Sequence, residues 1–491
     1  MPSAKTAVPI RAETGVPGLD DVLHGGLFRD RLYLVEGNPG SGKTTLAMQF
    51  LLQGQRAGER GLYLTLSETA EELHASASAH GFDLSGIEIA EFVADDEALA
   101  GESELTMFHP AEVELGESMR QMLEAVVRTD AQRVVLDSLS ELRLLAQTSL
   151  RYRRQIVALK RFLSARACTV LLLDDRTVEG ADLQLQSIAH GVISLDHQCP
   201  VYGPVLRQLT VVKFRGSNFV TGHQDFRIER GGLRVFPRLT ASEHEGDFKP
   251  APVPSGVSQL DQLLGGGTDR GTATLVVGPP GAGKTTIAVQ YAAAAAARGD
   301  HAAIFTFEEN KTLLLERCRG IGMSIEEGVG RGKVAIRQLD PGEVLPAEFA
   351  GLVSEAVLRA DARVVVIDSL NGYRNAMPEM RALTVQLHEL LKFLNRRGVA
   401  TFLIAAPADI LGDASSSMDA SYLADTVIIL RVYEHAGSMK KAISVLKKRS
   451  GRHEDTIRQI WFDHRGVHLS DQLLKLRGVL TGVPTELNEP A

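Results

Sequence analysis

The 491 residues are 44% hydrophobic and 23% charged, a balance typical of a globular protein with two to four domains of ordinary core size. The formal net charge of −8 argues against a broad basic surface for duplex DNA, and so against nucleic acid as a partner. No apolar stretch approaches the ~20 residues that a membrane span needs, and residues 1–15 lack the apolar core of a secretory signal, so we expect a cytoplasmic protein without a membrane partner.

The cysteines are three in number and widely spaced, at Cys168, Cys199 and Cys318. Because no CxxC pair occurs, the sequence supports neither a disulfide framework nor a zinc site. We expect three reduced thiols.

The first predicted unit covers residues 12–236. Short apolar runs rich in β-branched residues alternate there with helical patterns, at 32–36, 61–66, 133–136, 169–174, 192–195 and 209–213. Continuous apolar runs of this length are typical of strands buried on both faces of a parallel sheet. The pattern therefore predicts an α/β fold, with the last two runs as an antiparallel edge.

A glycine-rich loop follows the first of these runs and fits the Walker A pattern, which has the form GxxxxGK[ST]. Glycines allow positive φ angles, so that successive backbone N–H groups can surround phosphate oxygens at the start of the next helix. We expect Lys43 to contact the β- and γ-phosphates of ATP and Thr44 to bind Mg²⁺. The complete set of predicted nucleotide contacts in this loop is Gly37, Gly40, Ser41, Gly42, Lys43, Thr44 and Thr45.

Two further features of the first unit carry polar side chains. Asp137 ends an apolar run, where a Walker B carboxylate belongs, although an aspartate at a strand end can also cap a helix. Lys213 and Arg215 share one face of a late strand, since their spacing is two residues. They are either a solvated charged edge or a basic pair that reaches the γ-phosphate of a neighbouring subunit.

A charged and proline-rich segment, 237–254, follows and predicts a linker without a packed element. The motifs of the first unit then recur in the same order across residues 255–470, which indicates a domain duplication, with a frayed tail at 471–491. The second phosphate-binding loop and its Walker B aspartate comprise Gly278, Gly281, Ala282, Gly283, Lys284, Thr285, Thr286 and Asp368.

The two units differ after their second strand. Glu308 and Glu309 occupy this position in the second unit, where a carboxylate can deprotonate a water or hydroxyl beside the γ-phosphate and contact the metal. The first unit has Ser67 and Glu68 there, and serine cannot take the proton. Either Glu68 substitutes, or the first site binds ATP and hydrolyses it slowly. Lys447 and Arg449 repeat the late basic pair.

With these motifs the chain resembles the KaiC-like proteins, hexameric ATPases with two RecA-like domains. The resemblance runs from Gly15 to about Thr485 and includes both Walker A loops, the Phe307-Glu-Glu and Asp368-Ser-Leu motifs, and the ending Arg477-Gly-Val-Leu-Thr-Gly-Val-Pro-Thr. It implies two tandem P-loop domains in a homo-hexameric ring, with Mg·ATP between protomers.

The resemblance further implies that the second domain is a serine/threonine autokinase with Glu308 as general base and Lys447 and Arg449 acting in trans. Its Ser-Thr phosphoacceptor pair aligns with Ser421 and Tyr422, so the serine is kept and the threonine is lost. Ser421 could instead cap a helix or turn. If ATP mainly holds the assembly together, a signalling protein such as a histidine kinase or a response regulator is a candidate partner.

Two other functions remain open from the sequence. A RadA- or DnaB-like DNA-dependent ATPase also uses RecA cores, but no zinc finger, added DNA-binding domain or basic loop set is visible. A non-catalytic scaffold gated by ATP would account for Ser67 in the first unit only.

Overall fold

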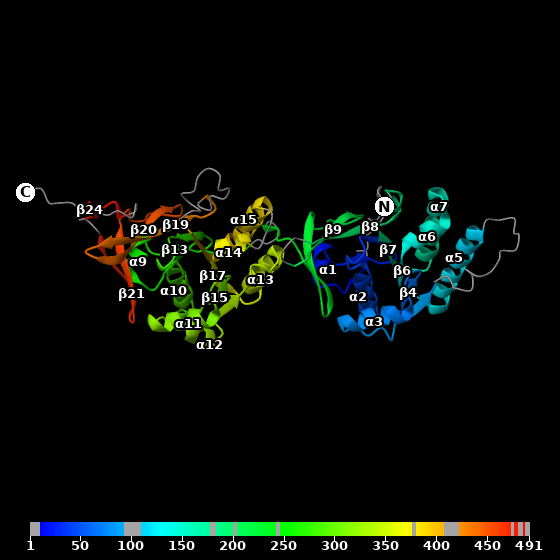
Figure 1. Ribbon diagram of the computed structural model, residues 1–491, viewed down its shortest axis with the longest axis horizontal. Helices are drawn as coiled ribbons and strands as arrows, with labels where there is room; N and C mark the ends of the chain where they lie inside the picture. The colour runs from blue at the N-terminus through cyan, green and yellow to red at the C-terminus, as the bar shows by residue number, and fades with distance from the viewer. Residues whose placement is uncertain are drawn as a thin grey trace, which may run out of the picture. The chain divides into compact units, whose positions relative to one another are not determined.

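The computed structural model describes residues 10–92, 110–176, 183–199, 204–241, 246–375, 380–406, 422–472, 476–479 and 485–486. The chain divides into two compact units, Met1–Arg238 and Leu239–Ala491 (Figure 1), each of which is described by itself. Within the described residues, no helix combines the length and the apolarity needed to cross a membrane.

The first unit is built on a nine-stranded sheet with the order β11-β10-β9-β8-β3-β7-β6-β4-β5. Every strand pair from β8 to β5 is parallel, and β8 to β11 are antiparallel. The strands are β3 (Leu32–Gly37), β4 (Gly61–Thr65), β5 (Glu88–Glu91), β6 (Arg133–Asp137), β7 (Thr169–Asp175), β8 (Gly191–Gln198), β9 (Leu206–Phe214), β10 (His223–Glu229) and β11 (Gly232–Phe236). A two-stranded sheet, β1 (Arg11–Ala12) with β2 (Leu27–Phe28), precedes them.

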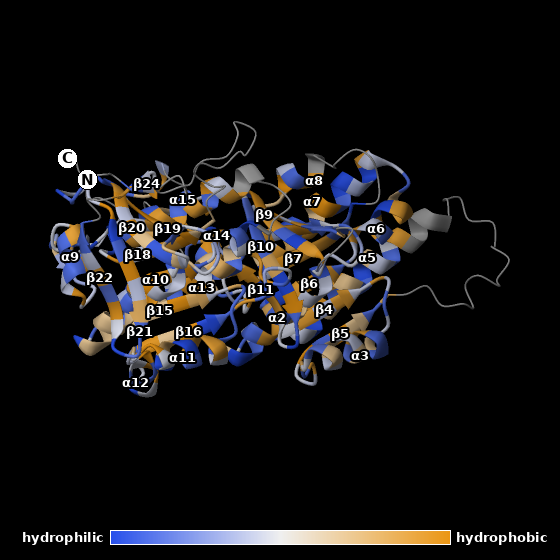
Figure 2. Cartoon of the chain, turned by 60° about the vertical axis from the view of Figure 1, so that its left-hand side comes forward, coloured by the Kyte–Doolittle hydropathy of each residue, from blue (hydrophilic) through white to orange (hydrophobic). Residues whose placement is uncertain are grey.

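Helices cover both faces of this sheet because successive residues of a buried strand point to opposite faces. Tyr33 and Val35 of β3 belong to a core with α2 and α3, whereas Leu32 and Leu34 belong to a second core with α5, α6 and α7. The helices are α1 (Leu19–Val22), α2 (Lys43–Arg56), α3 (Ala70–His80), α5 (Pro110–Thr129), α6 (Leu139–Ala146), α7 (Ser149–Ala165) and α8 (Leu183–Ile188). Figure 2 shows hydrophobic residues concentrated on the strands inside each unit.

The second unit repeats this plan, with the sheet order β16-β15-β17-β18-β14-β19-β20-β21-β22. Its strands are β14 (Ala273–Val277), β15 (His301–Thr306), β16 (Val334–Gln338), β17 (Ala362–Asp368), β18 (Ala400–Ala405), β19 (Thr426–His435), β20 (Ser438–Lys448), β21 (Arg458–Asp463) and β22 (Gly466–Gln472). Its helices are α9 (Ser258–Leu263), α10 (Lys284–Ala297), α11 (Lys311–Gly320), α12 (Ile325–Gly330), α13 (Pro346–Leu358), α14 (Leu370–Asn375) and α15 (Met380–Arg396). Short pairs β12 (Pro252–Val253) with β13 (Thr268–Asp269) and β23 (Leu476–Arg477) with β24 (Thr485–Glu486) complete it.

The predicted fold class, two tandem α/β P-loop domains with mostly parallel sheets, is confirmed. The antiparallel pairing of the last two predicted strands is also confirmed, but its placement at the edge is wrong. β8 lies beside the central strand β3, and two unpredicted strands, β10 and β11, extend the sheet beyond β9.

The prediction that 237–254 contains no packed element is wrong. Ala241 is 2% exposed in a core of the second unit, and Leu239 packs against the same core. Ala241 also donates its N–H to Glu389 Oε2 (3.3 Å) and accepts a hydrogen bond from Arg396 Nη1 (2.8 Å), both on α15. Pro252–Val253 forms β12, because a proline at an edge strand leaves the other backbone groups free to pair.

Candidate nucleotide-binding sites

A phosphate-binding loop connects β3 to α2 in the first unit and β14 to α10 in the second. Gly42 and Gly283, the residues before each helix, have φ angles of 105° and 104°, which favour glycine. A Cβ on Gly283 would lie 2.4 Å from Phe462 Cζ, so a side chain there would also collide. Neither helix has a side-chain cap at its N-terminus, so its first N–H groups can bind an anion.

The loop lysines fold back over their own loops. Lys43 Nζ donates to the carbonyls of Gly37 (2.9 Å) and Asn38 (3.1 Å). Lys284 Nζ makes the same two bonds, to Gly278 O (2.7 Å) and Pro279 O (3.1 Å). Burial lowers the pKa of Lys284. Each ammonium group therefore lies at the mouth of a loop shaped for a phosphate chain.

The buried hydroxyl of Ser41 supports phosphate binding in the first loop. Among the described atoms, Ser41 Oγ is buried and has no hydrogen-bond partner. Gly40, whose φ is 74°, has no described atom within 4 Å of the place where a Cβ would be, so the loop is open to solvent there. A bound oxyanion would satisfy the hydroxyl.

The Walker B aspartates lie beside the loop threonines. Thr44 Oγ1 donates to Asp137 Oδ2 (3.1 Å), and Thr285 Oγ1 donates to Asp368 Oδ2 (2.6 Å). Burial raises the pKa of both aspartates. A hydroxyl and a carboxylate are the oxygen ligands that Mg²⁺ prefers, with phosphates and waters as the others. This donor set fits Mg²⁺ in both units.

Tyr63 is a residue of the first site that the sequence reasoning missed. Its buried hydroxyl donates to Asp137 Oδ2 (2.5 Å), and burial raises its pKa well above the usual range. The equivalent residue of the second unit is Ile304, which cannot donate. The only available signal was a tyrosine within an otherwise aliphatic strand.

The glutamate positions correspond in the two units. Thr65 Oγ1 donates to Glu68 O (2.7 Å), and Thr306 Oγ1 donates to Glu309 O (2.9 Å), which makes the same turn after β4 and β15. Glu68 therefore occupies the position of Glu309, and Ser67 occupies the position of Glu308.

The carboxylates of these turns have different surroundings. Glu308 Oε1 accepts a hydrogen bond from Ser369 Oγ (2.9 Å), and Ser369 is the residue directly after the Walker B aspartate Asp368. Glu309 accepts from Arg317 Nη2 (2.8 Å), and burial raises its pKa. In the first unit, burial and the nearby Asp137 raise the pKa of Glu68.

The late basic pairs lie away from the phosphate-binding loop of their own unit. Lys213 of β9 pairs with Val192 of β8. Val192 lies three residues before Leu195, which pairs with Gly37 at the start of the loop. Lys213 Nζ donates to Ala189 O (2.8 Å) and Arg215 Nη2 donates to Ser187 O (2.9 Å), both near the end of α8.

The second unit has the same arrangement. Lys447 of β20 pairs with Val427 of β19, and Val427 lies two residues before Ile429, which pairs with Val277 at the end of β14. Arg449 Nη2 donates to Tyr422 O (3.3 Å) and lies 3.8 Å from Asp425. Tyr422 is 51% exposed. The other predicted phosphoacceptor, Ser421, lies outside the described residues.

A cluster of three carboxylates beside the first loop was also missed. Lys43 Nζ lies 2.7 Å from Asp175 Oδ1 at the end of β7, with side-chain exposures of 8% and 27%. Glu36 is paired with Arg176 (2.6 Å), and Asp174 with Arg143 (2.7 Å).

The second unit lacks this cluster. The strand registers place Val277, Ala405 and Ala406 at the corresponding positions. The visible signal was the sequence Asp174-Asp175-Arg176 after an apolar strand, where the second unit reads Ala405-Ala406-Pro407.

Comparison with known proteins agrees with this geometry. A model of the KaiC ATPase family matches residues 12–240 and 253–473. The circadian clock protein KaiC3 of Synechocystis sp. is 26% identical over 484 residues, which cover 96% of this chain and 94% of that protein. The circadian clock oscillator protein KaiC of Synechococcus elongatus is 26% identical over 490 residues, with coverage of 97% and 92%. The chain therefore belongs to the KaiC family of ATPases.

Proposed function

We propose that this chain binds Mg·ATP in both units, hydrolyses it mainly in the second, and transfers phosphate there to Ser421 of a neighbouring protomer in a homo-hexamer. The observation that carries this proposal is the carboxylate of Glu308, which Ser369 Oγ holds at 2.9 Å beside the Walker B aspartate. The first unit has a serine at this position, so we assign slow turnover to it.

The residues of the second unit have separate roles in this reaction. Glu308 accepts the proton of the attacking water or of the Ser421 hydroxyl. The oxygen of that water or hydroxyl bonds to the γ-phosphorus, and the bond between this phosphorus and the β–γ bridging oxygen breaks. Lys284 stabilises the charge on the departing diphosphate. When bound to Thr285 and Asp368, Mg²⁺ supplies further charge neutralisation.

The basic pair acts across the subunit interface in this proposal. Lys447 and Arg449 lie at and just beyond the carboxyl end of β20, which runs antiparallel to β19 and so places them beside the amino end of β19. The phosphate-binding loop of the same unit follows the carboxyl end of β14, which is parallel to β19. This separation supports contact with a γ-phosphate bound by another protomer, as an arginine finger makes. The same reasoning applies to Lys213 and Arg215 in the first unit.

The proposed role of the assembly is regulatory. The relatives named above are called circadian clock proteins, which supports a signalling or timing output in the cytoplasm, read by a partner such as a histidine kinase or response regulator. One phosphoacceptor of the family's pair is a tyrosine here, so we do not propose an ordered two-site phosphorylation cycle.

Turnover and phosphorylation measured on one sample test the proposal. Glu308→Gln should lower ATP hydrolysis about 10²–10⁴-fold, the usual contribution of a general base. Glu316→Gln, which makes the same charge change on the exposed face of α11, is the matched control. Ser67→Glu should increase turnover in the first unit, measured in a Lys284→Ala background.

Mass spectrometry after incubation with Mg·ATP should find phosphate on Ser421, and size measurement should find hexamers with nucleotide. ATP hydrolysis without phosphate on Ser421 removes the kinase part and leaves the ATPase. Unchanged turnover in Glu308→Gln removes the assigned mechanism. Salt-sensitive stimulation by single-stranded DNA would favour a DNA-dependent ATPase instead.

A further inference from the structure

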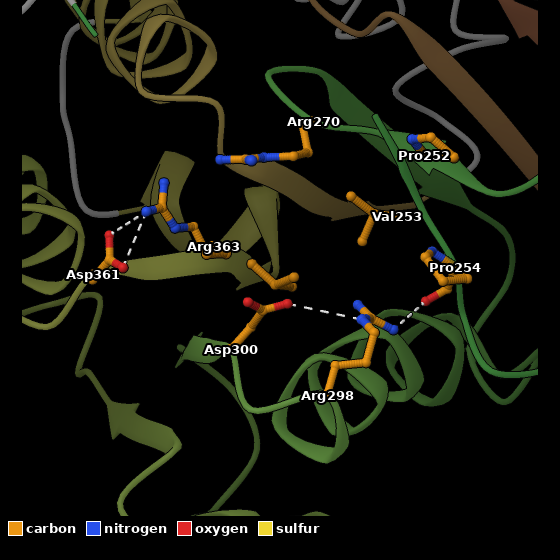
Figure 3. A pocket seen from close by; sticks show the side chains of 9 residues that line it. Pro252, Val253, Pro254, Arg270, Arg298, Asp300, Asp361 and Arg363 are labelled. Carbon is orange, nitrogen blue, oxygen red and sulfur yellow. Dashed lines mark hydrogen bonds and ion pairs between the residues drawn. The ribbon is translucent and has the colours of Figure 1, made fainter. Parts of the chain in front are cut away.

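The second unit contains a pocket of about 310 Å³ at the end of the sheet opposite its phosphate-binding loop (Figure 3). Two lining residues, Asp300 and Asp361, directly precede β15 and β17, so the pocket lies at the amino ends of these parallel strands. We call it the arginine pocket. Its lining includes the charged residues Arg270, Arg298, Arg363, Asp300 and Asp361 and the apolar residue Val364.

The corresponding position of the first unit is filled by an arginine. Gly61 faces Arg133 across β4 and β6, and Ala302 faces Val364 across β15 and β17, so Val364 occupies the place of Arg133. Gly54 makes room for the longer side chain, since a Cβ there would lie 2.4 Å from Arg133 Cδ.

The arginines at this position of the first unit are paired with a carboxylate. Arg133 is 2% exposed and donates to Glu59 Oε2 (2.5 Å), Glu13 O (2.7 Å) and Phe50 O (2.8 Å). Arg29 forms a second ion pair with Glu59. The side chain of Arg133 therefore occupies this position, and neither arginine is unpaired there among the described residues.

The second unit keeps the outer charges but loses the central arginine. Arg298 Nη1 donates to Pro254 O (2.9 Å), the carbonyl that corresponds to Glu13 O. Its Nε lies 3.8 Å from Asp300 Oδ2, a long distance for an ion pair. Arg270 corresponds to Arg29, but within the described part of the chain it has no carboxylate partner. Its contacts are a 3.4 Å hydrogen bond to Gly398 O and a 5.7 Å approach to the ring of Phe248.

The remaining arginine, Arg363, is paired with Asp361 at 2.8 Å on the edge of the pocket. Figure 3 shows the side chains of Arg270 and Arg363 extending toward the same region, with that of Arg298 below. Three guanidinium groups and two carboxylates give the lining a formal charge of +1. The planar fork of a guanidinium group matches phosphate oxygens, and the volume lies within the range of small-ligand sites.

We propose that the arginine pocket binds a phosphate group, with Arg270 as its main ligand, at a site separate from both nucleotide sites. The phosphate belongs either to free inorganic phosphate or to a small nucleotide. The site exists in the second unit alone, because Val364 and Asp300 replace the larger Arg133 and Glu59.

Equilibrium dialysis of radiolabelled inorganic phosphate against the full chain tests this assignment. The chain is first saturated with Mg²⁺ and a non-hydrolysable ATP analogue, so that both loops are occupied up to the γ position. We expect about one additional phosphate per chain, bound at least about tenfold more weakly by Arg270→Gln, a change of about 1.4 kcal/mol. Arg319→Gln, which removes a charge from exposed α11, should bind phosphate like the unmodified chain.

A second variant keeps the test decisive if Arg270→Gln unfolds. Val364→Arg combined with Ala295→Gly restores the arginine and the glycine of the first unit, and should abolish phosphate uptake. Absence of additional phosphate on the unmodified chain overturns the proposal. So does uptake by both variants that equals the uptake by the unmodified chain. Displacement of phosphate by lower concentrations of AMP identifies a nucleotide as the ligand, and lack of displacement identifies free phosphate.

Discussion

The ion pair between Lys43 and Asp175 gives the first nucleotide site a competitor for its substrate. Lys43 cannot contact the β- and γ-phosphates fully while it is 2.7 Å from Asp175 Oδ1. Binding of ATP must either break this pair or leave a carboxylate beside the phosphates. Asp175→Asn removes the negative charge with little change in shape, so it should strengthen ATP binding at the first site.

The size of the effect follows from the distance and the burial. Two unit charges 4 Å apart interact by about 4 kcal/mol at an effective dielectric constant of ~20, before any cost of desolvation. Asp175 is 27% exposed and solvent reduces its effect, so we expect a net gain of about 1.4 kcal/mol, or roughly tenfold in Kd.

Calorimetric titration with Mg²⁺ and a non-hydrolysable ATP analogue can measure this change. A Lys284→Ala background restricts the reading to the first site. The matched control is Ala406→Asp in a Lys43→Ala background, which places a carboxylate at the corresponding position of the second unit and should weaken binding about tenfold. Equal or weaker binding by Asp175→Asn would refute the competition and indicate that the aspartate positions Lys43 for the phosphates.

Three further outcomes are expected. Arg133→Met should lower the free energy of unfolding by about 3 kcal/mol in urea denaturation, because it leaves a buried carboxylate with one cation fewer; a loss under 1 kcal/mol would contradict the assigned burial. A maleimide at pH 8 should label only Cys199 in the native protein, since Cys168 and Cys318 are buried and burial raises the pKa of each thiol to about 11; mass spectrometry identifies the labelled peptide. Burial lowers the pKa of His190, so the unfolded chain binds this proton more tightly and stability should fall as pH decreases below about 6.5; a His190→Gln variant should show a smaller decrease in melting temperature between pH 7 and pH 5.

The sequence was sufficient for the parts of the fold that are local and apolar. The parallel strands β3, β4, β6, β7 and β8 were predicted because each contains a run of buried, mostly apolar residues. The parallel edge strand β5 was missed, since its sequence EIAE has exposed glutamates at both ends. β10 has the sequence HQDFRIE and was missed, since it is not a continuous apolar run and one of its buried residues is the polar Gln224. The packing of Ala241 was missed because proline and charge dominate the composition around it.

The candidate sites show the same division. The Walker residues were identifiable because the loop that holds them is contiguous, whereas their proposed roles remain predictions. The contact of Tyr63 with Asp137 joins residues 74 positions apart, and that of Arg176 with Glu36 joins residues 140 positions apart. Such pairs depend on strand order, which the sequence did not specify. Comparing the two halves position by position would have singled out Asp175 and Val364.

The packing of residues 239–241 and 252–253 on the second unit determines where the chain can be divided. A fragment that begins at Ser255 would lose the buried methyl of Ala241, the hydrogen bonds of its backbone to α15, and the strand that pairs with Thr268–Asp269. Its exposed apolar surface would favour aggregation. Expression of the second half alone should therefore start before Leu239, although sequence similarity to the family resumes only at residue 253.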